Sequence, residues 1–129
     1  RRVKALVESG VKVLGLAATH AKIRALLAGL PVAGFSGTLS GGESVFADID
    51  GAALGSVRAK TGNLSTVTTL AGLVTDKAGR TLAFAFMADQ IPAAGMLKTA
   101  ADAIDKAAAA LANCGCRLRA LAAARTVGL

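Results

Sequence analysis

The sequence contains no tryptophan or tyrosine, and its only aromatic side chains are four phenylalanines. Proteins that bind single-stranded nucleic acids stack bases on aromatic side chains, so no such platform is expected. The formal net charge is +7 and the isoelectric point is near 10.1, but the basic residues gather at the two ends and are otherwise scattered. We therefore expect no nucleic-acid partner, and an anionic cell-wall environment suits the same charge.

Long apolar segments are also absent, although 53% of the residues are hydrophobic. No stretch approaches the roughly 20 consecutive apolar residues that span a bilayer, so no transmembrane segment is expected. The 129 residues leave room for one domain with one core.

Cysteine is scarce. Cys114 and Cys116 are too few for a disulfide framework or a zinc site. A bond between them across one glycine would strain the bridge geometry. We therefore expect thiols near solvent, or pairing with cysteines outside this sequence.

The sequence also lacks the sets of residues that a metal site or a catalytic triad requires. The single histidine, His20, has no acidic residue spaced to orient it, so a surface histidine is expected rather than a catalytic triad. The acidic residues Glu43, Asp48 and Asp50 lack the ligand number of a calcium loop. No metal or cofactor is therefore expected.

The central part of the sequence has the pattern of an antiparallel meander. Strands are predicted at 56–61, 66–75 and 81–88, with a glycine-containing turn at 76–80. Alanine content and an apolar stripe predict a helix at 94–112. The fold class is therefore α/β of the α+β type, an antiparallel sheet meander flanked by helices.

Both faces of the third predicted strand are apolar. Leu82, Phe84 and Phe86 point one way, whereas Ala83, Ala85 and Met87 point the other. The sheet should therefore be covered on both sides.

The segments before the meander have weaker signals. Helical pattern predicts a helix at 21–28 with Thr19 as its N-cap, and Pro31 prevents its continuation. Residues 34–56 are rich in glycine and predict loops with one short helix near 52–54. The last residues, 118–129, predict a short additional helix.

The most informative motif is Lys60-Thr61-Gly62, entered from one extended run and followed by another. A Lys-Thr-Gly tripeptide is one of three signature motifs of penicillin-binding proteins and serine β-lactamases. Taken alone it equally fits a solvated strand lysine, an ordinary β-forming threonine and a bulge glycine.

The flanking residues favour the functional interpretation. The segments Leu30-Pro31-Val32-Ala33-Gly34-Phe35-Ser36-Gly37-Thr38-Leu39, Leu70-Ala71-Gly72 and Asn113-Cys114-Gly115-Cys116-Arg117 resemble the C-terminal part of D-alanyl-D-alanine carboxypeptidases. These are low-molecular-mass penicillin-binding proteins of class C, and the likeness is greatest to actinobacterial members. It implies that residues 1–129 are the C-terminal portion of a β-lactamase/transpeptidase-like domain, with 118–129 outside the match.

The resemblance implies a role for each residue of the motif. Lys60 would supply a fixed positive charge and contact the serine of the second motif, and Thr61 would donate to the terminal carboxylate of the substrate. Gly62 would leave room for a peptide at the strand edge. The backbone N–H of Asn63, where family members usually carry Thr or Ser, would complete the oxyanion hole. A side-chain hydroxyl contact to substrate is lost there.

The other two signature motifs are not found in this sequence. Ser9-Gly10-Val11-Lys12 has the Ser-x-x-Lys form, but it lies too close to Lys60 and makes a poor helix start. No Ser-x-Asn occurs. The nucleophile is therefore expected in a more N-terminal part of the same protein, outside these residues.

The implied function is a serine-type D-Ala-D-Ala carboxypeptidase or endopeptidase that trims peptidoglycan stem peptides, binds β-lactams and is exported to the cell envelope. The 129 residues alone would be inactive and would self-associate through an exposed sheet edge. The alternative is a non-catalytic sheet-and-helix module that binds a complementary fragment or a cell-wall polymer.

Overall fold

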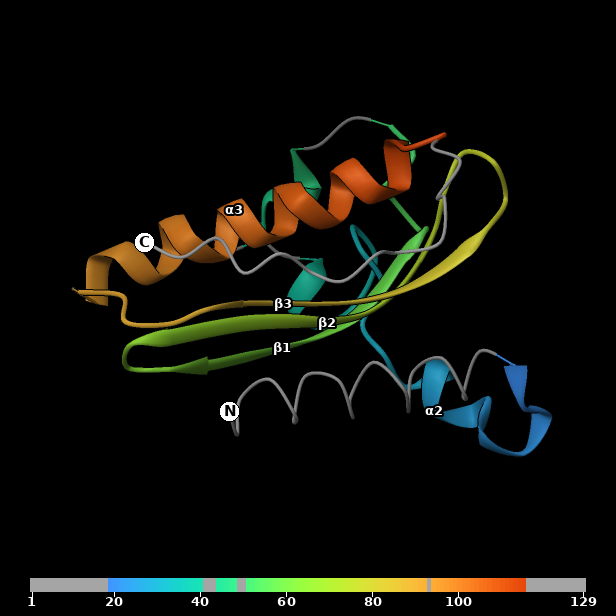
Figure 1. Cartoon of the computed structure of the whole chain (residues 1–129), viewed down its shortest axis with the longest axis horizontal. Coiled ribbons are helices and arrows are strands. Elements are labelled where there is room, and N and C mark those ends of the chain that lie inside the picture. Colours follow the sequence, from blue (N-terminus) through green and yellow to red (C-terminus); the bar gives the residue numbers. More distant parts are fainter. Residues whose placement is uncertain (1–18, 41–43, 49–50, 93, 116–129) are drawn as a thin grey trace, which may run out of the picture.

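A computed structural model describes residues 19–40, 44–48, 51–92 and 94–115. A three-stranded antiparallel sheet in the order β1-β2-β3 forms its centre, made of β1 (Val57–Leu64), β2 (Val67–Thr75) and β3 (Thr81–Ala88). The long helix α3 (Ala94–Asn113) crosses one face of this sheet (Figure 1). The meander and the helix predicted from the sequence are both confirmed.

The strand register confirms the predicted division of side chains between the two faces. Phe84 pairs with Gly72, and Phe86 pairs with Leu70, whose side chain is buried beneath α3. Phe84 and Phe86 also contact each other, with ring centroids 5.3 Å apart. The opposite face carries the smaller side chains Ala83 and Ala85. Among the described residues only the first face is covered by a long helix.

Strand β1 is longer than predicted, because it continues past residue 61 to Leu64. Gly62 and Asn63 are poor strand formers, but side-chain hydrogen bonds hold them to β2. Thr69 Oγ1 donates to the carbonyl of Gly62 at 3.0 Å, and Thr68 Oγ1 donates to Asn63 Oδ1 at 2.7 Å. The whole Lys-Thr-Gly motif therefore lies within a strand.

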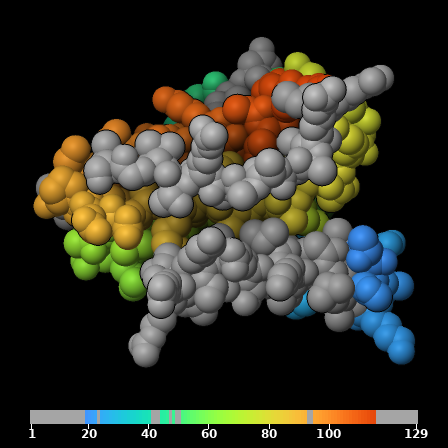
Figure 2. All heavy atoms as spheres, viewed as in Figure 1, coloured from blue at the N-terminus to red at the C-terminus, as the bar shows by residue number. Residues whose placement is uncertain are grey.

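The core lies between the sheet and α3, and the glycine-rich loop contributes to it. Leu39 and Phe46 are fully buried, and they come from the short 3-10 helices η2 (Gly37–Leu39) and η3 (Val45–Ala47). On α3 the buried apolar residues are in its second half: Ile104, Ala108, Ala109 and Ala112. Small alanine side chains allow this helix to approach the strands closely, and Figure 2 shows α3 packed on the sheet.

Two of the weaker predictions are wrong. Residues 51–56 form turns instead of a short helix, because Gly51 and Gly55 have positive φ values of 113° and 74°. The helix expected at 21–28 divides into a 3-10 turn, η1 (Ala21–Ile23), and the four-residue α2 (Ala25–Ala28). His20, and not Thr19, is the N-cap of η1, and it makes no side-chain capping bond.

Other sequence expectations concern the ends of the chain. Cys114 is disulfide-bonded, so the expectation of a thiol near solvent is wrong there. Cys116, Ser9, Lys12 and residues 118–129 lie outside the described residues. Of the helices that the structure describes, none has the length and apolar character needed to cross a bilayer.

The β2–β3 turn is organised by one buried carboxylate. Asp76 Oδ1 accepts hydrogen bonds from the backbone N–H groups of Ala78 and Arg80, both at 2.9 Å. Asp76 Oδ2 accepts from the Arg80 guanidinium at 2.8 and 2.6 Å. The Arg80 backbone N–H bond, with the other hydrogen bonds of the turn, holds the pKa of Asp76 below its ordinary value, although burial acts in the opposite direction.

The substitution Asp76→Asn should therefore destabilise the protein at neutral pH. A carboxyl whose folded pKa is lowered stabilises the fold above the unfolded pKa of about 4, and this contribution disappears as the pH falls through the folded value. Urea unfolding at several pH values should show the difference between wild type and variant shrinking toward acid pH. Asp89→Asn removes the same charge from an exposed side chain and serves as control. A pH-independent difference would contradict this account.

Gly72 is required by the close approach of β1 and β2. A Cβ at this position would overlap the carbonyl oxygen of Arg58 and lie 2.6 Å from Ala59 Cα. Backbone atoms cannot move aside as a flexible side chain does, so a methyl group here must separate the two strands.

Gly72→Ala should lower the free energy of unfolding by about 1–3 kcal/mol or more, as expected for an overpacked core. Gly95→Ala is the matched control, because it is a helical position where an added Cβ has no described atom within 4 Å apart from its own chain neighbours and helix backbone. The control should be neutral or stabilising by up to about 1 kcal/mol. Urea denaturation followed by circular dichroism measures both, and equal effects of the two variants would refute the steric argument.

Candidate functional site

Within the described part of the chain, the edge of β1 that faces away from β2 is paired over its first half only. The N–H of Ala33 donates to the carbonyl of Val57, and the N–H of Ala59 donates to the carbonyl of Pro31, both at 3.0 Å. The backbone groups of Val57 and Ala59 therefore point away from β2. Because backbone direction alternates along an antiparallel strand, those of Thr61 and Asn63 point to the same edge.

Lys60 lies on the face of the sheet opposite α3. It pairs with Ala71, whereas the neighbouring pair Thr61 and Leu70 faces the helix. The exposed Lys60 ammonium donates to the carbonyl oxygen of Thr61 at 2.6 Å. This bond keeps the positive charge close to the free edge of β1.

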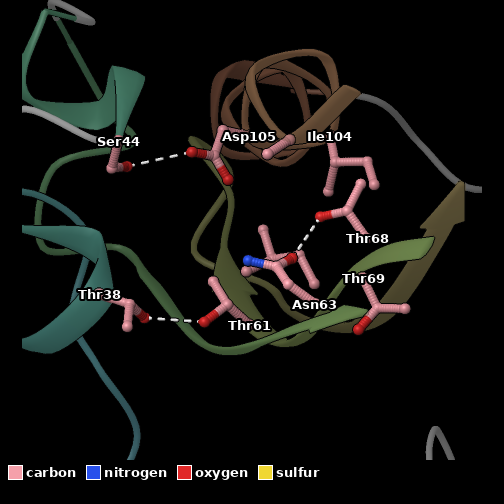
Figure 3. A pocket seen from close by; sticks show the side chains of 10 residues that line it. Thr38, Ser44, Thr61, Asn63, Thr68, Thr69, Ile104 and Asp105 are labelled. Carbon is pink, nitrogen blue, oxygen red and sulfur yellow. Dashed lines mark hydrogen bonds between the residues drawn. The ribbon is translucent and has the colours of Figure 1, made fainter. Parts of the chain in front are cut away.

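The Thr61 hydroxyl points to the α3 side and donates to Thr38 Oγ1 at 3.0 Å (Figure 3). Thr38 belongs to η2, which lies beside β1. No motif in the sequence assigns a role to Thr38, although it lies in one of the segments that carry the family resemblance.

Gly62 and Asn63 are each contacted by a threonine side chain of β2. A Cβ on Gly62 would come within 2.7 Å of Thr69 Oγ1, so the absent side chain makes room for this hydroxyl. The Asn63 side-chain oxygen accepts a hydrogen bond from the buried Thr68. The backbone N–H of Asn63 faces the edge of β1 that lies away from β2. The assignments of Lys60, Thr61, Gly62 and Asn63 as site residues stay predictions.

A polar cavity of about 110 Å³ lies under this part of β1, between the sheet, α3 and the loop that precedes β1 (Figure 3). Polar side chains from three parts of the chain line it: Thr38, Ser44, Thr61, Asn63, Thr68, Thr69 and Asp105. The site residues of β1 are thus supported from beneath by hydroxyl, amide and carboxyl groups.

Asp105 is the buried acid of this cavity. The Ser44 hydroxyl donates to Asp105 Oδ2 at 3.0 Å and so ties the loop before β1 to α3. Burial raises the pKa of Asp105 above its ordinary value, the charge of Asp102 acts in the same direction, and the Ser44 hydrogen bond opposes them. No local sequence signal marks this pair, because 61 residues separate its members.

The histidine and acidic residues considered from the sequence as metal or triad residues do not line this cavity in the part of the chain that the structure describes. His20 and Asp48 are exposed, and Glu43 and Asp50 lie outside the described residues. In the described ranges no three His, Cys, Asp or Glu side chains are grouped so that they would hold a metal ion.

The fold is similar to that of known penicillin-binding proteins. Penicillin binding protein 4 of Haemophilus influenzae superposes with a TM-score of 0.54 at 33% sequence identity, covering 63% of this chain and 17% of that protein. The complex of the same protein with a novel β-lactam superposes with a TM-score of 0.55 at 31% sequence identity, covering 64% of this chain and 18% of that protein. The sheet and helix are therefore those of a penicillin-binding fold.

The sequence defines the family within this class. Residues 7–111 match the model of the D-Ala-D-Ala carboxypeptidase 3 (S13) family, and the chain belongs to that family. Carboxypeptidase DacB of Mycolicibacterium smegmatis is 44% identical over 107 residues, which are 81% of this chain and 22% of that protein. A carboxypeptidase of Mycobacterium tuberculosis is 42% identical over 94 residues, which are 73% of this chain and 19% of that protein. The chain thus spans about a fifth of the length of these relatives.

Asp105→Asn should stabilise the protein at neutral pH. The amide oxygen still accepts the Ser44 hydrogen bond, while the cost of burying a charge is removed. A carboxyl whose folded pKa is raised destabilises the fold above that value, and this penalty disappears as the pH falls toward the unfolded pKa of about 4. The gain should therefore shrink in acid. Urea unfolding from neutral to acid pH measures it, with Asp89→Asn as the charge control. A destabilised Asp105→Asn at neutral pH would refute this.

Proposed function

We propose that the gene product with this chain is a serine-type D-Ala-D-Ala carboxypeptidase or endopeptidase that acts on peptidoglycan stem peptides. The proposal is supported above all by the position of Lys60-Thr61-Gly62 on an edge strand whose next residue, Asn63, directs its backbone N–H to the unpaired part of the edge. Family membership supports the same reaction.

The reaction is acyl transfer followed by hydrolysis. A serine hydroxyl attacks the carbonyl carbon before the terminal D-Ala, a Ser Oγ–carbon bond forms, the peptide C–N bond breaks and D-Ala leaves with the proton. Water then attacks the ester and regenerates the serine. The serine comes from the N-terminal part of the protein, so the 129 residues supply the Lys-Thr-Gly strand without the nucleophile.

Each residue of the edge acts on a different part of the substrate. Lys60 holds a positive charge beside the terminal carboxylate and the attacking hydroxyl, and Thr61 donates its hydroxyl to that carboxylate. The peptide lies along the free edge of β1, as in β-augmentation, and the bare backbone of Gly62 allows its approach. The Asn63 N–H stabilises the oxyanion, a contribution typically worth about 3–4 kcal/mol for one donor.

The proposed partners follow from this reaction. They are the stem peptide, β-lactams that acylate the same serine, and the N-terminal part of the protein, which would cover sheet surface left open in the described residues. Without that part the exposed edge favours self-association. A stem-peptide substrate requires export to the cell envelope. No metal or organic cofactor enters the proposed steps.

The test is covalent labelling with a fluorescent penicillin. The full gene product should be labelled, and the isolated 129 residues should not. Lys60→Ala in the full gene product should slow acylation at least about a hundredfold, because a charge that stabilises the transition state is lost. Lys77→Ala removes an exposed lysine from the β2–β3 turn and should leave the rate unchanged.

Three results would count against the proposal. A full gene product that retains Lys60 but resists the probe would favour the non-catalytic binding module. An unchanged rate for Lys60→Ala would remove this residue from the mechanism. Labelling of the isolated chain would reject the assignment of the nucleophile to the N-terminal part of the protein.

A further inference from the structure

One hydrogen bond joins the side-chain hydroxyls of Thr61 and Thr38. The two Oγ1 atoms are 3.0 Å apart, and either hydroxyl can be the donor. A hydroxyl offers a single O–H and two lone pairs. A Thr61 that donates to Thr38 has no proton left for a substrate carboxylate, so Thr38 must be the donor of this bond if Thr61 is to donate to one.

Both directions of the bond fit the same heavy-atom positions, because both partners are hydroxyls. When Thr38 is the donor, its proton points to Thr61, and the Thr61 proton can point to the carboxylate. A chain of two hydroxyls that ends on a charge is polarised along its length, which strengthens each bond. A side chain without a hydroxyl at position 38 cannot take part.

The backbone around Thr38 fixes it at this distance. Gly37 has φ +58° and packs so closely on Pro31 that an added Cβ would lie 3.0 Å from its ring. The N–H of Gly34 donates to the carbonyl of Leu39 at 2.8 Å, and the Leu39 side chain is fully buried. These contacts make η2 a firm support for the Thr38 hydroxyl.

The same segment is anchored to the strand that carries Thr61. The carbonyl of Pro31 accepts from the N–H of Ala59, two residues before Thr61. Thr38 and Thr61 are therefore held in register by backbone hydrogen bonds. Such support restricts the rotation of a binding side chain before the ligand arrives.

We propose that Thr38 is a positioning residue for carboxylate recognition: it donates to Thr61 when substrate binds and thereby directs the Thr61 proton to the carboxylate. This inference rests on the proposed function, because it assumes that Thr61 binds a terminal carboxylate. It adds a specificity determinant from η2, outside the Lys-Thr-Gly strand.

The experiment compares two ligands on the full gene product. Acylation rates are measured with benzylpenicillin, which carries the free carboxylate, and with its methyl ester, which does not. Thr38→Val keeps the shape of the side chain and removes the hydroxyl. It should slow acylation by the acid about ten- to a hundredfold, the loss expected for a hydrogen bond to a charged group, and should slow the ester much less.

Three further variants complete the design. Thr38→Ser restores a hydroxyl and should recover most of the selectivity for the acid. Thr38→Ala repeats the test with a smaller side chain, if valine disturbs folding. Thr75→Val changes an exposed threonine at the far end of β2 and should leave both rates unchanged.

Each other outcome rejects the inference. An equal slowing of acid and ester would mean that Thr38 only supports the loop. An unchanged or faster reaction with the acid in Thr38→Val would mean that Thr38 merely competes for the Thr61 proton. If Thr38→Ser does not recover the selectivity for the acid but reacts normally with the ester, the effect of Thr38→Val belongs to the methyl group of Thr38 and not to its hydroxyl. If the wild-type protein is not acylated at all, the proposed function fails first and this inference fails with it.

Discussion

The pairing of β1 on both of its edges is the constraint on which the rest of the site depends. Strand β2 occupies one edge along the whole length of β1, whereas the segment at Pro31–Ala33 occupies the other edge only as far as Ala59. The backbone of the next residues is thereby left facing outward. An unpaired strand edge normally favours aggregation. Here the unpaired edge lies beside a lysine and two hydroxyl groups, which is consistent with its proposed use as a binding site.

The support beneath β1 is polar where a structural strand would have apolar contacts. Thr38 of η2 and Thr68 of β2 are hydrogen-bonded to side chains of β1. Asp105 of α3 lines the same cavity and holds Ser44 of the preceding loop. Each buried side-chain polar atom among the described residues has a hydrogen-bond partner. Satisfied polar networks fix one arrangement of their members, at the cost of a buried charge at Asp105.

Sequence patterns predicted those elements whose signals are local. Alternating apolar residues, the Asp76 turn and the alanine-rich helix all act over short distances, and the structure confirms them. The end of β1 was predicted too early, because Gly62 and Asn63 are stabilised by threonines on the partner strand. The Ser44–Asp105 pair depends on the packing of α3 against the loop, which no short pattern encodes.

The directions of the groups on β1 constrain how the remainder of the protein meets this chain. The Lys60 side chain leaves the sheet on the face opposite α3, the Thr61 side chain leaves on the α3 face, and the Asn63 N–H lies near the plane of the sheet at its edge. A serine that uses both the ammonium and this N–H must therefore lie beside the free edge and toward the face opposite α3. Under the proposed function, the polypeptide that carries the nucleophile packs on that side, away from α3 and the polar cavity beneath β1.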